Sequence, residues 1–340
     1  MGTAFCFPAA DAGHSVQLVG THLDGDWIKS IQQVRIHPKL NMKLPESVTA
    51  LLHDQLGDAM SSAPELIVIG VSSAGVSWAI EQLGPGLKTN TPILMLTKGL
   101  EAQHGSLQIF PEAVRKGLSA YSIERLSVGA VGGPCIAREL AARCDTSVVI
   151  SYSDEQVLQQ VVRLLGAPYY HVRPSTDVVG IEVCAALKNF YTLAVGAAAG
   201  LFAKQGTAAN GALMHNPAAG LFTQALTEMS RMVQFLGGTE ASVLGLAGAG
   251  DLYVTCQAGR NSRMGHLLGS GLPYSVAKAG HMAEETVEGA ELAFVLEPVF
   301  ADLFGRGLLA PEAFPLAVAV IDAICHDAPM ALAFNSFHRI

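Results

Sequence analysis

Short apolar runs alternate with helical patterns along the first half of the chain, whereas helical patterns alone fill the second half. Runs rich in Val, Ile and Leu that are separated by helical spacing are typical of parallel strands joined by crossovers. The predicted strands are Ser15–Gly20, Leu66–Val71, Ile93–Thr97, Leu126–Val131, Ser147–Ser151 and Tyr169–Val172. From Asp177 onward the sequence is rich in Ala, Leu and Gly and contains no convincing strand. The pattern therefore predicts a doubly wound α/β sheet domain followed by an all-helical domain.

The change of pattern places the domain boundary near Arg173–Thr176, where Pro174 and a candidate helix-capping residue interrupt the chain. We predict a sheet domain over residues 1–174 and a helical domain over residues 175–340, with a ligand in a cleft between them. The apolar stretch Phe190–Ala203 is shorter than the roughly 20 residues that cross a bilayer. It is therefore predicted as a buried helix and not as a membrane span.

Composition narrows the class of protein. Half of the 340 residues are apolar and 15% are charged, which suits a compact α/β protein. The net charge of −8 argues against nucleic acid as a partner, so an anionic ligand would need local Lys and Arg side chains. The six cysteines form no CxxC pair and no zinc-ligand spacing, which predicts free thiols and no metal site. We find no signal-peptide pattern and expect a cytoplasmic protein, whose apolar helical domain is compatible with a homodimer.

The glycine-rich segment 245–261 gathers polar side chains of the kinds that form sites. If Asp251 and Thr255 lie one helical turn apart, their carboxylate and hydroxyl share a face and can point into one pocket. Arg260 and Asn261 then precede a helical pattern, so a guanidinium, an amide and free helix N–H groups are offered to an anion such as phosphate. Taken alone, the segment is equally well interpreted as a glycine-punctuated turn with a surface arginine.

Three further segments carry residues that a ligand could use. Lys188 and Asn189 lie in apolar, small-residue surroundings, where desolvation would suit a lysine to exchange a proton near neutral pH. Lys98 ends a predicted strand, at the edge of the sheet where such domains bind ligands. The segment 132–139, Gly-Gly-Pro-Cys-Ile-Ala-Arg-Glu, follows another strand and could let the backbone approach a cofactor. Each also has a purely structural interpretation, as a lysine that reaches solvent or as a chain turn.

Taken in order, short blocks of the sequence closely resemble the NAD(P)-dependent glycerol-3-phosphate dehydrogenases. These blocks span most of the chain and are Met1-Gly-Thr-Ala4, Ala12-Gly-His14, Lys98-Gly-Leu-Glu101, Gly132-Gly-Pro134, Leu187-Lys-Asn189, Gly248-Ala-Gly-Asp251, Gly259-Arg-Asn261 and Val287-Glu-Gly289. No single block is decisive, but the ordered set is specific. The resemblance implies a Rossmann-type sheet domain and the reversible reduction of dihydroxyacetone phosphate by NAD(P)H. The product, sn-glycerol 3-phosphate, is a precursor of phospholipids.

The resemblance also implies a role for each candidate site residue. Lys188 matches the family's general acid/base lysine, and Asp251 matches the residue that orients it. Asn189 and Thr255 would line the substrate. Its phosphate would be held by Arg260 and Asn261, and Lys98 would contact both substrate and cofactor. The residues that match the family's cofactor contacts are Gly2, Lys98, Gly133, Cys135, Ala137, Arg260 and Glu288.

The start of the chain departs from the family's pattern. Met1-Gly2 looks like the last two positions of the GxGxxG fingerprint, so the first strand and the first two glycines are missing from the sequence. That strand is central in a sheet of order 3-2-1-4-5-6, and its loss is expected to leave its neighbours unpaired and to weaken cofactor binding. A start site assigned too late, at an internal methionine, is the favoured interpretation. Pro8 is expected to kink the following helix unless it falls in the first turn.

Two other departures bear on specificity. After the second strand, where NAD-binding domains place an acid on the ribose, the chain has Gly20-Thr-His22 and no acid before Asp24. The absence of an acid at this position favours NADP, or mixed use of NAD and NADP. Gly206–His215 looks like extra or altered sequence beside the substrate pocket. Two alternatives stay open: a related two-domain dehydrogenase for another small hydroxy acid or an opine-like substrate, and a degenerate Rossmann-type binding protein without activity.

Overall fold

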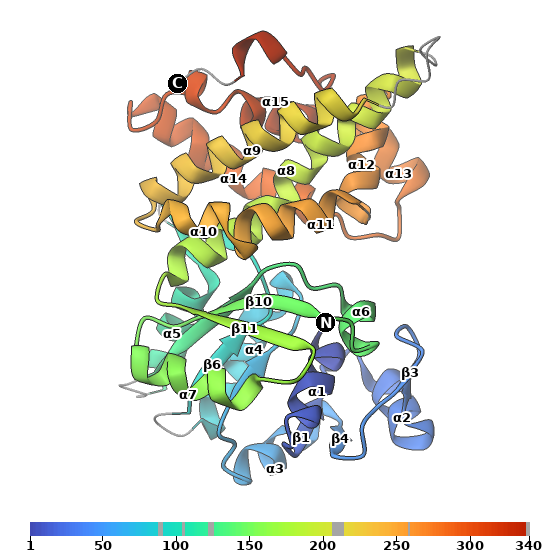
Figure 1. Cartoon of the computed structure of the whole chain (residues 1–340), viewed down its shortest axis with the longest axis vertical. Helices are drawn as coiled ribbons and strands as arrows, with labels where there is room; N and C mark the ends of the chain where they lie inside the picture. The colour runs from blue at the N-terminus through green and yellow to red at the C-terminus, as the bar shows by residue number, and fades with distance from the viewer. Residues whose placement is uncertain (88–90, 104–105, 122–125, 206–213, 258, 338–340) are drawn as a thin grey trace. The chain divides into compact units, whose positions relative to one another are not determined.

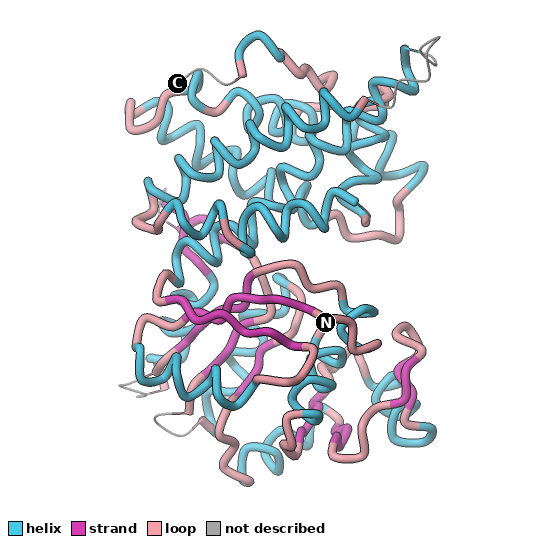
Figure 2. Tube along the Cα trace, in the orientation of Figure 1, coloured by secondary structure: helices cyan, strands magenta, loops and turns pink. Residues whose placement is uncertain are grey.

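The chain forms two compact units. The computed structural model describes all residues except 88–90, 104–105, 122–125, 206–213, 258 and 338–340 (Figure 1). Unit 1 comprises Met1–Lys98 and Phe110–Val178, and unit 2 comprises Gly99–Ile109 and Val179–Ile340. Most of the described strands belong to unit 1, and unit 2 is mainly helical (Figure 2). Segment 99–109 belongs to the helical unit 2, although it lies early in the sequence. Hydrophobic periodicity cannot predict this assignment, because it depends on contacts with residues far along the chain.

Unit 1 contains a five-stranded sheet in the order β11-β10-β9-β6-β5 and a separate parallel pair, β1 with β4. The strands of unit 1 are β1 (Val16–Val19), β2 (Ile36–His37), β3 (Met42–Lys43), β4 (Val48–Leu51), β5 (Ile67–Ile69), β6 (Ile93–Met95), β9 (Val128–Gly132), β10 (Thr146–Ser151) and β11 (Tyr170–Ser175). Each of the six predicted strands is present, with ends that differ by at most three residues. The expected α/β sheet followed by a helical part is confirmed.

Two features of the sheet differ from the sequence prediction. Strands β9 and β10 pair antiparallel, with Val149 opposite Gly132, although parallel neighbours were predicted. The connection between them contains only the five-residue helix α6 (Ala137–Ala141), whereas a parallel crossover usually needs a longer helix. The pattern also missed β4 and the hairpins β2–β3 and β7–β8, the latter formed by Leu100–Gln103 and Ser106–Ile109. These strands have two to four residues each, too few to show an alternation.

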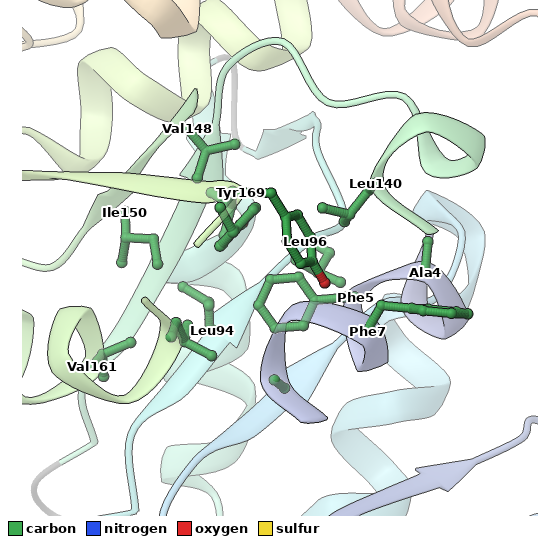
Figure 3. Close-up of a cluster of buried hydrophobic side chains, with 14 of the residues drawn as sticks. Ala4, Phe5, Phe7, Leu94, Leu96, Leu140, Val148, Ile150, Val161 and Tyr169 are labelled. Carbon is green, nitrogen blue, oxygen red and sulfur yellow. The ribbon is translucent and has the colours of Figure 1, made fainter. Parts of the chain in front are cut away.

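Helix α1 anchors the core of unit 1. Its side chains Phe5 and Phe7 are buried in one cluster with Leu94, Ile150 and Tyr169 (Figure 3). Burying one such aromatic side chain contributes roughly 1.5–3 kcal/mol. The other helices of unit 1 are α2 (Gly25–Val34), α3 (Leu56–Ser61), α4 (Val76–Leu83), α5 (Phe110–Ser119) and α7 (Glu155–Leu165).

Helix α1 runs from Gly2 to Asp11 and continues past Pro8, although Pro8 lies beyond the first turn. Proline has no backbone N–H to donate within the helix. Pro8 is itself buried, so the packing of α1 compensates for the missing hydrogen bond.

Unit 2 is built around the buried helix α8 (Val178–Gln205). Its other helices are α9 (His215–Phe235), α10 (Glu240–Leu244), α11 (Asp251–Gln257), α12 (Arg260–Gly269), α13 (Tyr274–His281), α14 (Glu288–Gly305) and α15 (Pro315–Cys325). Among the described helices, α8 alone is long and apolar enough to cross a membrane by length and composition. However, 78% of its most apolar window is buried inside the protein, as in a core helix.

Glycines bring α8 and α12 into close contact. A Cβ on Gly265 would lie 2.2 Å from the carbonyl oxygen of Leu193, and a Cβ on Gly269 would lie 2.1 Å from that of Ala197. From the other side, a Cβ on Gly200 of α8 would lie 2.0 Å from the carbonyl oxygen of His266 in α12. Because α12 begins at Arg260, this contact places the first residues of α12 beside α8.

We expect Gly265→Ala to lower the free energy of unfolding by about 1–3 kcal/mol, because the new methyl group meets backbone that cannot rotate away. Chemical denaturation measures this effect. The matched control is Gly280→Ala in α13, where a Cβ meets nothing within 4 Å. Alanine there should be neutral or stabilise slightly, since it favours a helix over glycine. Equal stability of the two variants would contradict the close packing of α8 on α12.

Candidate active site

A buried ion pair lies at the centre of the candidate site in unit 2. Lys188 of α8 donates from its Nζ to Oδ1 of Asp251, and the two side chains are only 11% and 1% exposed. Asp251 begins α11 directly after the π-helical turn Leu246–Gly250. This turn packs tightly, because a Cβ on Gly248 would lie 2.1 Å from the carbonyl oxygen of Val243. The glycine run thus brings the Asp251 carboxylate to α8, where it compensates the charge of the buried lysine.

A chain of hydrogen bonds links three helices beside this pair. Asn261 of α12 donates to Asn189 of α8 (Nδ2 to Oδ1, 3.0 Å), and Asn189 donates to Glu288 of α14 (Nδ2 to Oε2, 3.0 Å). The Oδ1 of Asn261 accepts from the backbone N–H of Gly289 at 3.0 Å. Asn189 and Asn261 were both predicted as site residues, and they lie in direct contact.

Arg260 donates to the other carboxylate oxygen of Glu288, Oε1, at 3.2 Å. Both side chains are about half exposed, 46% for Arg260 and 49% for Glu288. An exposed pair of this kind contributes little stability, so an anionic ligand can replace the Glu288 carboxylate on the guanidinium. The sequence placed Arg260 and Glu288 in the site but not in contact with one another.

The hydroxyl of Thr255 is satisfied within its own helix. As predicted, Asp251 and Thr255 lie one turn apart, but the Oγ1 of Thr255 donates to the backbone oxygen of Asp251 at 2.6 Å. We predicted that this hydroxyl and the Asp251 carboxylate point into one pocket. In the structure the hydroxyl is instead directed to the backbone of its own helix. Side-chain hydroxyls in a helix commonly bond to the carbonyl one turn before them.

Two residues near Lys188 were not among the predicted site residues. Thr192, one turn after Lys188, donates to its backbone oxygen at 2.7 Å, and Thr192 Oγ1 lies 3.7 Å from the Sγ of Cys256. Burial raises the pKa of Cys256 to about 11, so the thiol stays protonated near neutral pH and is a poor nucleophile. The helical spacing from Lys188 to Thr192 is the one sequence signal that could have found this neighbour.

A hollow of about 630 Å³ opens beside Arg260 in unit 2. The polar residues in its wall include His215, Cys256, Gln257, Arg260, Arg263 and His266. Arg263 is paired with Glu285, whereas Arg260 is held by the exposed Glu288. The wall thus offers positive charge to a small anion. Of the altered segment 206–215, residues 206–213 lie outside the described residues.

The predicted cofactor residues of unit 1 lie after parallel strands or at helix starts. Gly2 opens α1, whose first turn has no side-chain cap, and a Cβ on Gly70 after β5 would lie 3.1 Å from the Cα of Gly2. Gly133, directly after β9, has a φ of +115°, which favours glycine. Cys135 precedes α6, Ala137 begins it, and Lys98 follows β6.

The uncapped N–H groups of α1 beside a close glycine pair fit a pyrophosphate group. A dinucleotide-type sheet unit and a helical unit with a buried lysine–aspartate pair define the class, a two-domain nicotinamide-dependent dehydrogenase.

Comparison with known proteins agrees with this class. The family models for the N-terminus and the C-terminus of NAD-dependent glycerol-3-phosphate dehydrogenase match residues 1–158 and 177–334. The chain belongs to the NAD-dependent glycerol-3-phosphate dehydrogenase family.

Individual relatives match over most of their length. The chain is 35% identical to the NADP(+)-dependent glycerol-3-phosphate dehydrogenase of Archaeoglobus fulgidus over 272 residues, which are 80% of this chain and 78% of the relative. It is 33% identical to glycerol-3-phosphate dehydrogenase [NAD(P)+] of Chlamydia pneumoniae over 279 residues, 81% and 78% of the two chains. The crystal structure of glycerol-3-phosphate dehydrogenase from Coxiella burnetii matches with a TM-score of 0.78 and 26% identity, covering 98% of this chain and 94% of that one. These matches confirm the resemblance inferred from the sequence blocks.

Proposed function

We propose that the chain catalyses the reversible reduction of dihydroxyacetone phosphate to sn-glycerol 3-phosphate with NAD(P)H. The observation that carries the proposal is the buried Lys188–Asp251 pair in a chain of this family, with Asn189, next to Lys188, linked by hydrogen bonds to Asn261 and, through Glu288, to Arg260. The nicotinamide, when bound, supplies the hydride that the substrate's C2 accepts. The chain's own residues then have two tasks, which are to handle the proton and to hold the phosphate.

Lys188 is the proposed proton donor to the substrate oxygen. As the ketone is reduced, negative charge develops on this oxygen, and an ammonium group both stabilises the charge and delivers the proton. Asp251 accepts a hydrogen bond from the Nζ of Lys188 and so orients the lysine in its buried position. In the reverse direction Lys188 accepts the proton from the alcohol. We propose that Asn189 and Asn261 line the substrate. A hydrogen bond between their side-chain amides holds the two residues together.

Arg260 is the proposed anchor of the substrate phosphate. We expect Arg260→Ala to raise KM for dihydroxyacetone phosphate by about 10–100-fold and to lower kcat less, because a charge-assisted hydrogen bond to phosphate is lost. Steady-state kinetics measures both constants, with KM for NADPH taken in the same variant because the resemblance implies that Arg260 contacts both cofactor and substrate. The control is Arg263→Ala, in the same wall but paired with Glu285. An equal rise of KM in the control would place the phosphate elsewhere.

We propose NADP as the slightly favoured cofactor. Two observations support this: the loop after β1 has no acid before Asp24, and the Archaeoglobus fulgidus relative is described as NADP(+)-dependent. The product of the proposed reaction, sn-glycerol 3-phosphate, would supply phospholipid synthesis. Cytoplasmic location and a homodimeric state stay predictions from the sequence.

The proposal is tested by following oxidation of NADPH and of NADH, in separate assays, with dihydroxyacetone phosphate. Turnover with the phosphorylated substrate and none with dihydroxyacetone is the expected result. Comparable rates without the phosphate would favour the alternative, a dehydrogenase of another small substrate. Absence of turnover together with absence of dinucleotide binding would favour a degenerate binding protein.

A further inference from the structure

Lys98 lies where the chain passes from unit 1 to unit 2, because unit 1 includes Lys98 and unit 2 takes over at Gly99. Residues 96–99 connect β6 to β7 without regular secondary structure. The position of Lys98 therefore depends on the individual hydrogen bonds that its neighbours make. The proposed function gives Lys98 a binding role but does not explain what holds it in place.

The residues on both sides of Lys98 are anchored, each within its own unit. In unit 1, the hydroxyl of Thr97 donates to the backbone oxygen of Val71, which follows β5, at 2.8 Å. In unit 2, the backbone N–H of Gly99 donates to Oε1 of Glu182 in α8 at 3.0 Å. Lys98 is thus held between two anchors, while its own side chain is half-buried.

The anchor in unit 2 is a completely buried acid. Glu182 is 0% exposed, so water cannot take the place of its carboxylate on the Gly99 N–H. A carboxylate that accepts from a backbone N–H forms a shorter and stronger hydrogen bond than a neutral acceptor does. Glu182 also lies on the same helix as Lys188, six positions before it. The helix that carries the proposed proton donor therefore also holds the segment that follows Lys98.

We propose that Glu182 is a positioning residue, which fixes Lys98 for contact with the substrate by holding the Gly99 backbone on α8. This inference rests on the proposed function, in which Lys98 contacts substrate and cofactor. Glu182 acts through Lys98 and takes no part in proton transfer. Anchoring favours binding because a loose loop would lose its conformational freedom each time the substrate binds, whereas an anchored loop has already lost it on folding.

Glu182→Ala removes the acceptor for the Gly99 N–H and should raise KM for dihydroxyacetone phosphate about tenfold. Glu182→Gln keeps an oxygen acceptor of the same length and should restore most of the affinity. Steady-state oxidation of NADPH measures KM and kcat in each variant. The double variant with Lys98→Ala decides the route: if Glu182 acts through Lys98, Glu182→Ala should raise KM no further once Lys98 has been removed.

Glu228→Ala is the matched control for lost stability. Glu228 is also a glutamate at 0% exposure in unit 2, and it accepts from the backbone N–H groups of Leu316 and Ala317. Glu228→Ala should leave KM unchanged, whatever it costs in stability. Hydrogen exchange followed by mass spectrometry supplies a readout without turnover. Peptides that contain Gly99 should exchange faster in Glu182→Ala than in wild type, and at the wild-type rate in Glu228→Ala.

Three results would overturn the inference in a chain that reduces dihydroxyacetone phosphate. These are independent effects of Glu182→Ala and Lys98→Ala on KM, a loss in Glu182→Gln equal to that in Glu182→Ala, and an equal rise of KM in Glu228→Ala. Unchanged exchange at Gly99 in Glu182→Ala would also contradict the anchor. A wild-type chain that does not reduce dihydroxyacetone phosphate would instead overturn the proposed function, and the inference with it, while hydrogen exchange would still report on the anchor itself.

Discussion

Lys188→Ala is expected to lower kcat for dihydroxyacetone phosphate by about 10²–10⁴-fold while KM changes far less, because general acid catalysis acts in the transition state. Lys188 lies in α8 at 9% exposure and donates to Asp251, so water does not readily take the place of this proposed proton donor. Stopped-flow or steady-state oxidation of NADPH measures the loss. A variant with near-normal turnover would remove Lys188 from the mechanism.

Loss of the lysine also leaves the Asp251 carboxylate buried without its partner, which costs about 3–5 kcal/mol of stability. Unfolding must therefore be measured beside activity. Lys188→Met paired with Asp251→Asn removes both charges and keeps the volume, so the double variant should recover stability but not turnover. Lys29→Ala, an exposed position in α2, serves as the matched lysine control and should change neither quantity.

At pH 5, Glu228→Ala is expected to lower the free energy of unfolding by at least about 3 kcal/mol, without a direct effect on the candidate active site. Glu228 of α9 is fully buried and accepts from the backbone N–H groups of Leu316 and Ala317, at 2.7 and 2.8 Å. These are the first turn of α15, which has no side-chain cap of its own. Gln224 and Tyr191 also donate to this carboxylate, at 2.7 and 3.3 Å.

The same substitution should change how stability depends on pH. Burial raises the pKa of Glu228 from 4.5 to about 7, although its four donors act in the opposite direction. The folded chain therefore binds this proton more tightly than the unfolded chain. The stabilisation is complete below about pH 4.5 and is lost as pH rises through 7, a change of about 3 kcal/mol.

Urea unfolding of wild type and Glu228→Ala at pH 5, 6 and 8 measures this difference, which should shrink as pH rises. Glu284→Ala, an exposed acid in the same unit, should follow the wild-type pH dependence. If the stability difference between wild type and Glu228→Ala is the same at all three pH values, Glu228 keeps one protonation state throughout, and the raised pKa is wrong.

Much of the fold could be predicted because the signals are local. The strands β1, β5, β6, β9, β10 and β11 are apolar runs bounded by turn residues, and such runs depend only on neighbouring positions. The antiparallel pairing of β9 with β10 could not be predicted, because the direction of pairing depends on the path of the connection through α6. Membership of segment 99–109 in unit 2 likewise depends on contacts with distant residues such as Glu182, whose Oε1 accepts from the backbone N–H of Gly99 at 3.0 Å.

The candidate site shows the same division. Lys188, Asn189, Asp251, Arg260 and Asn261 could be named because charged and amide side chains stand in glycine-rich or apolar segments. Their partners could not be named, since 63 positions separate Lys188 from Asp251 and 99 separate Asn189 from Glu288.

The sequence by itself determined the order of the elements, the family and the types of side chain that the chemistry requires, because local hydrophobic spacing and ordered motifs carry this information. Only the tertiary structure decided which of these side chains meet. The close glycine contacts of α8 with α12 place Asn261 on Asn189, and the turn 246–250 carries Asp251 to Lys188. Such contacts arise from packing between segments far apart in the chain, and no short window of sequence records them.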